Sequence, residues 1–260
     1  MELREWAIQI LSAENLDAKL DSPTLLTDEQ PGPALIWQEP ARPLALKFRL
    51  HSRKDRLPPL HELGALDKRA SCLHRFAAHE LLAVEIMAFA LLAFPEAPKH
   101  FRRSVAATLK EEQEHVRLYL TRMQELGLHF GDLPVFRHFW AYTRFMTTPL
   151  HYISLMNLTF EMANLDFAPM YRDIFTKYGD MGSAELMQRI VIDEVSHVAS
   201  GYHWLNKLRP ASLSDWETWV GSLPPKMELV RARARGHHFN PTYRREAGIP
   251  EPWIAQLSAL

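Results

Sequence analysis

Two Glu-x-x-His motifs stand out in the sequence, at residues 112–115 (Glu-Gln-Glu-His) and at residues 194–197 (Glu-Val-Ser-His). A separation of three residues places the carboxylate and the imidazole on one face of a helix. That face is otherwise apolar in both motifs, with Leu109 and Val116 beside the first pair and Ile190 beside the second. Because a buried carboxylate is costly unless it is paired or bound to a metal, the pattern favours metal ligation.

Two further glutamates lie in apolar helical stripes upstream of these motifs. Glu80 precedes Glu112 by 32 residues, and Glu161 precedes Glu194 by 33. The two halves of the chain therefore repeat, with a shift of 81 or 82 residues. One Glu from each of two helices and Glu-x-x-His from each of two others can bind two metal ions inside a helical bundle. The sequence predicts this ligand set to be Glu80, Glu112, His115, Glu161, Glu194 and His197.

Oxygen-rich ligation of this kind suits divalent iron or manganese better than zinc. We therefore expect two divalent ions, with iron favoured and a manganese–iron pair or two manganese ions as alternatives. The single cysteine, Cys72, excludes an internal disulfide and a cysteine-based metal site.

Helical periodicity predicts the elements that carry these residues. Long helices are expected from Asp67, as N-cap, to the stop at Pro95, and then over 97–126, 149–177 with a kink at Pro169, and 183–208. A short helix over 3–14, an aromatic helix over 135–146 and short helices in 211–260 complete the pattern. No segment alternates as a strand does, so we predict an all-α fold.

We expect the four long helices to form a four-helix bundle with a crossover between the second and the third. The predicted organisation has three parts. Residues 1–60 form an N-terminal helix and a proline-rich wrapping arm, residues 61–210 form the bundle, and residues 211–260 form a C-terminal helical extension of the same domain.

Five segments carry a resemblance to a known family: residues 74–83, 111–115, 158–168, 193–198 and 239–241. Through them the chain resembles the ferritin-like superfamily, and more closely the domain-of-unknown-function family 455, over nearly its whole length. The superfamily's tRNA hydroxylase branch is a distant relation. The resemblance implies a four-helix bundle with a dinuclear metal site. It also implies partners for the imidazoles, for which Glu111 and Asp193 are the candidates, each reaching the histidine of the opposite helix.

Other polar residues near the motifs have a plain structural interpretation. Glu85 and Asp166 each follow a single glutamate by five residues, and carboxylates so placed more often face a helix seam or solvent than a metal. Tyr119 is either a redox-active phenol or, preferably, core packing. Asn157 and Asn164 flank Glu161, where they shape an oxygen pocket or hydrogen-bond a kinked helix.

Composition limits the function classes. The net charge of −1 excludes a polybasic nucleic-acid clamp, and the basic stretch over 226–245 reads as a solvated tail, although nucleic acid is disfavoured rather than excluded. The longest apolar stretch, over 81–94, is shorter than the ~20 residues of a membrane span. No membrane partner is expected. The first residues lack the pattern of a secretory signal, so we expect a cytoplasmic protein.

The favoured function is an oxygen-activating oxidase or hydroxylase. Its substrate is expected to be a small molecule or a modified nucleoside, with dioxygen and an electron donor as further partners. One alternative is iron storage or detoxification of peroxide and oxygen. Another is a structural protein in which the metals only staple the helices together.

Overall fold

Helices make up nearly all of the regular structure in the computed structural model, which describes residues 1–50, 56–224 and 234–260. The chain divides into two compact units, Met1–Ala141 and Tyr142–Leu260. This boundary falls between the two halves of the sequence repeat, so each unit holds one Glu-x-x-His motif. The fold class is all-α, as predicted.

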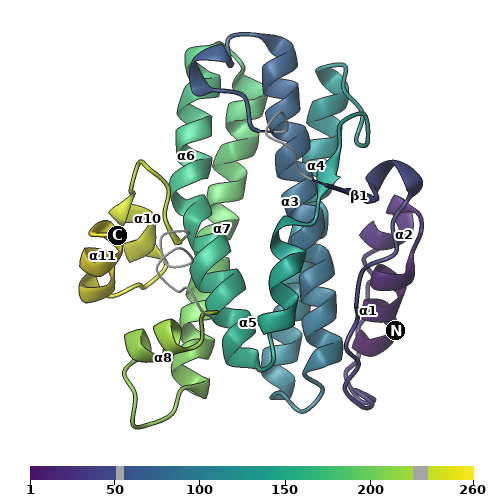
Figure 1. The fold of residues 1–260 in the computed structure, drawn as a ribbon, viewed down its shortest axis with the longest axis vertical. Helices are drawn as coiled ribbons and strands as arrows, with labels where there is room; N and C mark the ends of the chain where they lie inside the picture. Colours follow the sequence, from purple (N-terminus) through teal and green to yellow (C-terminus); the bar gives the residue numbers. More distant parts are fainter. Residues whose placement is uncertain (51–55, 225–233) are drawn as a thin grey trace. The chain divides into compact units, whose positions relative to one another are not determined.

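The first unit is built on a helical hairpin of α3 (Leu66–Ala93) and α4 (Lys99–Glu125), which lie side by side in Figure 1. Every residue from 80 to 95 is buried, which makes α3 a core helix. By length and composition α3 resembles a membrane span, but 89% of its most apolar window is buried inside the protein. Gly127 ends α4 at a φ of 77°, which lets the N–H of Leu128 bond to the carbonyl of Met123.

The N-terminal segments pack against this hairpin. α1 (Leu3–Ser12) buries the apolar stripe that its periodicity predicts and lies against α3, and the short α2 (Leu16–Leu20) contacts α4. The arm that follows contains the 3₁₀ turns η1 (Leu44–Leu46) and η2 (Leu60–Glu62) and the two-residue strand β1 (Phe48–Arg49). β1 pairs in parallel with β2 (Val135–Phe136), which joins the arm to the connection after α4.

The second unit contains a second long hairpin (Figure 1). Its first arm runs through α5 (Pro149–Leu155), a π-helical turn η4 (Met156–Glu161) and α6 (Met162–Lys177). Its second arm is α7 (Met181–Leu208), capped by the Asp180 carboxylate on the N–H of Ser183. Three short helices follow within the described part of the tail, as predicted: α8 (Asp215–Gly221), α10 (Pro241–Glu246) and α11 (Glu251–Ser258).

Four local predictions were wrong. α3 begins at Leu66 with Ala65 as its N-cap, so Asp67 lies in the first turn instead. The expected strand-free fold contains β1 and β2, and the aromatic helix over 135–146 is β2 followed by the 3₁₀ helix η3 (His138–Phe145). The third long helix is interrupted at η4, before Pro169, which lies inside α6.

Long-range contacts explain why the aromatic segment over 138–145 is not an α-helix. Trp140 donates a hydrogen bond from Nε1 to the carbonyl of Gln38 at 3.0 Å, and its ring packs edge-on against Phe89. Both partners are far away in the sequence, and helical periodicity contains no information about them.

His74 links α3 to the connection that follows α4. Its buried ring accepts a hydrogen bond at Nε2 from the N–H of Gly131, at 3.1 Å, and packs against Phe130. Burial, and then the positive charge of Arg75, lower the pKa of His74 to about 4.

This shift predicts a pH dependence of stability. The unfolded chain takes up a proton at His74 near pH 6.5 and the folded chain only near pH 4, so stability is complete above pH 6.5 and falls as the pH falls. Between pH 7 and pH 5, His74 should cost about 2 kcal/mol of unfolding free energy. His74→Gln keeps an acceptor for the N–H of Gly131. Between pH 7 and pH 5, its free energy of unfolding, measured by urea titration, should fall by about 2 kcal/mol less than that of the wild type. His61→Gln, a change at an exposed histidine, should follow the wild type; equal pH slopes for all three proteins would contradict the assignment.

Candidate metal centre

The first unit brings one carboxylate of α3 together with the Glu-x-x-His motif of α4. Glu80, Glu112 and His115 are all buried, with side chains offering ligand atoms that lie within 4.8 Å of one another. Nδ1 of His115 lies 3.2 Å from Oε2 of Glu112. The hairpin accounts for this meeting, because α4 returns alongside α3 after the turn at 94–98.

The second unit holds the corresponding three residues. Glu161 is the last residue of the π-helical turn η4, and Glu194 and His197 lie on α7. None of the three is more than 4% exposed. Oε2 of Glu194 lies 3.7 Å from Nδ1 of His197, so the motif on α7 has its two side chains on one face, as the spacing predicts.

Two asparagine side chains donate to the carboxylates of this second group. Nδ2 of Asn157 lies 2.7 Å from Oε2 of Glu161 and 3.3 Å from the carbonyl oxygen of His197. Nδ2 of Asn164 lies 2.7 Å from Oε1 of Glu194. The sequence offered an oxygen pocket or hydrogen bonds to a kinked helix. The amides instead donate mainly to the acidic side chains, and Asn157 also bonds to the backbone of the neighbouring helix α7.

The π-helical turn is the local feature that sequence reasoning missed. The N–H of Met162 bonds to the carbonyl of Asn157, five residues back, and the hydroxyl of Thr159 donates to the carbonyl of Ser154 at 2.6 Å. Single π turns inside α-helices often occur at functional sites. The six residues of η4 include neither Gly nor Pro, so no strong helix breaker marks the turn in the sequence.

Glu85 and Asp166 do not join either group. Both are buried, so of the two positions expected, a helix seam or solvent, solvent is excluded. The Glu85 carboxylate pairs with Lys19 of α2 at 3.0 Å and accepts hydrogen bonds from Nε and Nη2 of the Arg42 guanidinium in the arm. Burial lowers the pKa of Lys19, and the charge of Glu85 opposes that effect.

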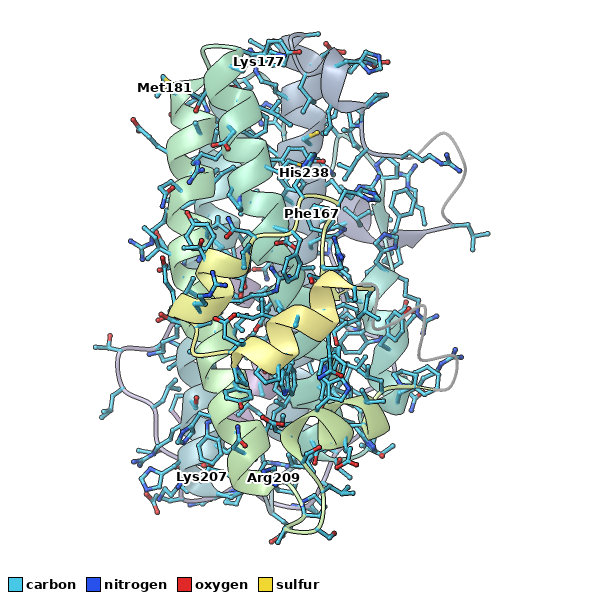
Figure 2. The ribbon with its side chains drawn as sticks, turned by 90° about the vertical axis from the view of Figure 1, so that its left-hand side faces the viewer. Phe167, Lys177, Met181, Lys207, Arg209 and His238 are labelled. Carbon is cyan, nitrogen blue, oxygen red and sulfur yellow. The ribbon has the colours of Figure 1, made fainter. Side chains whose placement is uncertain are left out.

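Asp166 of α6 anchors the tail. Its carboxylate pairs with Nη1 and Nη2 of Arg244 at 2.7 and 2.9 Å and accepts the backbone N–H groups of Gly236 and Asn240. α10 therefore lies against α6 and α7, and in Figure 2 the labelled Phe167 and His238 mark the place where the tail crosses α6.

The remaining candidates are Tyr119, Asp193 and Glu111. Tyr119 is buried with its ring centre 6.0 Å from that of Phe76, in line with core packing. Asp193 accepts a hydrogen bond from Arg189 at 2.6 Å and Glu111 is exposed, so their roles as partners of the histidines stay predictions.

The basic stretch over 226–245 lies only partly within the residues that the structure describes. Lys226, Arg231 and Arg233 lie outside the described residues. Arg235 donates to the backbone carbonyls of Leu257 and Ser258. The buried Arg244 pairs with Asp166 of α6, so neither arginine is presented as part of a basic patch.

The donor set fits a hard or borderline divalent cation. Each unit offers two carboxylates and one imidazole in buried positions, where a cation would offset the cost of burying the acids. A neutral imidazole and ionised carboxylates are the forms that ligate metals.

Comparisons place the chain among known families. The model of a family described as "Protein of unknown function (DUF455)" matches residues 4–255, a range that includes both units and all six candidate ligands. Comparison with curated proteins gives no match, and comparison with solved structures gives none.

The buried Asp166–Arg244 pair generates a prediction about stability. Asp166→Asn removes the charge that compensates the buried Arg244 and should lower the free energy of unfolding by about 3–5 kcal/mol. Urea unfolding followed by tryptophan fluorescence measures the change. Glu251→Gln, which removes the partner of Arg245 in an exposed pair, should leave the midpoint unchanged. Equal midpoints for the two variants would show that Asp166 does not hold the tail.

Proposed function

The chain belongs to the DUF455 family, and we propose that it is a dinuclear metal protein of the ferritin-like kind in which each helical hairpin binds one ion. In this proposal Glu80, Glu112 and His115 hold the first ion, and the corresponding residues of the second unit, Glu161, Glu194 and His197, hold the second. The two hairpins then pack as a four-helix bundle, with the segment over 126–148 as the crossover.

The observation that carries the proposal is the recurrence of one buried group in two units. The same three residue types, in the same order and nearly the same spacing, are buried in both hairpins. Buried ion pairs also occur in this protein, but at Glu85 and Asp166 the acids pair with Lys or Arg. The candidate ligands are accompanied by histidine instead, which favours a metal as the cation.

Iron is the favoured metal, with a manganese–iron pair or two manganese ions as alternatives, because four carboxylates and two imidazoles make an oxygen-rich donor set. Bound iron would supply the reduction of dioxygen that underlies an oxidase or hydroxylase. The chain's own part is to hold the carboxylates and imidazoles in fixed orientations and, through their burial, to limit the access of water.

The appended segments favour an enzyme over a storage cage. In the first unit α1 and the arm cover the hairpin, and in the second unit the tail covers α6 and α7. Cage-forming subunits need the outer faces of their helices for contacts with other subunits. The substrate class that we propose is a small molecule or a modified nucleoside, since the near-neutral charge disfavours bulk nucleic acid.

Metal stoichiometry is the first test. After anaerobic loading with ferrous iron and removal of excess metal, elemental analysis should find two ions per chain. Glu112→Ala combined with Glu194→Ala should lose both, because each group then lacks one of its two carboxylates. Glu114→Ala, at an exposed residue of the same helix, should keep both ions. One ion or none in the wild type would contradict the dinuclear proposal.

Reaction with dioxygen distinguishes the enzyme from its alternatives. Rapid mixing of the reduced, iron-loaded protein with dioxygen should give a fast absorbance change whose amplitude saturates at two irons per chain. Uptake and mineralisation of iron well beyond that ratio would favour storage over the enzyme. An iron-loaded protein that does not react with dioxygen would show that the metals only stabilise the packing of the helices.

A further inference from the structure

Asn157 connects the π-helical turn to the neighbouring helix of its hairpin. The buried amide donates both to the side chain of Glu161 and to the backbone carbonyl of His197 on α7. One side chain thereby fixes the carboxylate of Glu161 and bonds to the backbone of α7 at His197, the residue that carries another candidate ligand.

Gly201 makes this position of Asn157 possible. A Cβ atom on Gly201 would lie 2.2 Å from the Cβ of Asn157 and 3.0 Å from its Cγ, which is closer than real Cβ contacts allow. Asn157 therefore packs directly on the backbone of α7, one turn after His197. Any larger residue at 201 must displace the asparagine.

Asn164 makes a second link from the same arm of the hairpin to α7. It lies on α6 and donates to Glu194 on α7 at 2.7 Å. Each carboxylate of the second group thus accepts one amide N–H, on Oε2 of Glu161 and on Oε1 of Glu194. An amide bonded to one oxygen restricts the carboxylate's rotamer and leaves the other oxygen to face a metal.

The first unit has no such amides at the corresponding positions. In the repeat register Asn157 corresponds to Phe76, Asn164 to Ala83 and Gly201 to Tyr119. Phe76 and Tyr119 contact each other as aromatic rings, 6.0 Å between centres, where the second unit has asparagine against glycine. The repeat therefore preserves the candidate ligands and changes what surrounds them.

From this difference we propose that Asn157 and Asn164 are positioning residues that make the second group the tighter of two unequal metal positions. The inference rests on the proposed function, since it requires that both groups bind metal. Carboxylates that are already oriented lose less conformational entropy when the ion binds. The first ion to bind therefore occupies Glu161, Glu194 and His197, and the second occupies the group of the first unit.

Titration of the full-length, metal-free protein with cobalt(II) tests this order. Calorimetry measures the affinities, and visible absorption reports the ligand environment of each ion. The wild type should bind in two resolved steps. His197→Ala should abolish the tight step and His115→Ala the weak one.

Asn157→Leu keeps the number and branching of the side-chain heavy atoms and removes the amide. It should weaken the tight step about 10- to 100-fold and alter its absorption spectrum, while the weak step keeps its affinity. Gly201→Ala should act in the same direction, because it displaces Asn157. Phe76→Leu, at the corresponding position of the first unit, is the matched control and should leave the tight step unchanged.

The outcomes separate this inference from the proposed function. Two equal steps in the wild type, or equal weakening of both steps by Asn157→Leu, overturn the inference and leave the dinuclear site standing. A wild type that binds no cobalt overturns the proposed function itself. Should Asn157→Leu fail to fold, the half-buried Asn164→Ala gives the same readout, and an unchanged tight step there also overturns the inference.

Discussion

Burying a carboxylate among apolar side chains is costly unless another group compensates its charge, and both units are organised by this requirement. The hairpin helices bury acids on the faces that they turn toward the core. Glu85 and Asp166 are compensated by cations from segments outside the hairpins, namely α2, the arm and the tail. The other buried acids of the hairpins lie beside histidines, and there we propose that metal ions take the same role.

The ion pairs of Glu85 and Asp166 also attach the N-terminal segments and the C-terminal tail to their hairpins. Glu85 and Asp166 occupy corresponding positions of the repeat, yet Glu85 binds a segment that precedes its hairpin and Asp166 binds one that follows. The buried acid at this position of the repeat is thus paired by α2 and the arm in the first unit and by the tail in the second. Each piece covers its own hairpin, a feature better suited to enclosing a site than to building a cage from bare helices.

Departures from the repeat are as informative as the repeat itself. The π-helical turn occurs only in the second unit among the described residues, and it carries Glu161 at its end and Asn157 near its start. Asn157 of this turn packs against Gly201, at positions where the first unit has an aromatic pair. Two groups with the same ligand types can therefore differ in rigidity, as the proposed pair of unequal metal positions requires.

The sequence by itself determined the all-α class, the long helices and the residues that share a helix face, because spacing and periodicity are local properties of the chain. It also singled out four acids and two histidines that prove to be buried: Glu80, Glu112, His115, Glu161, Glu194 and His197. The partners of Glu85 and Asp166, the 3₁₀ form of the aromatic segment and the π-helical turn were decided only by the tertiary structure. Each depends on contacts between residues far apart in the chain, such as Arg244 with Asp166 or Trp140 with Gln38, and helical periodicity does not record such contacts.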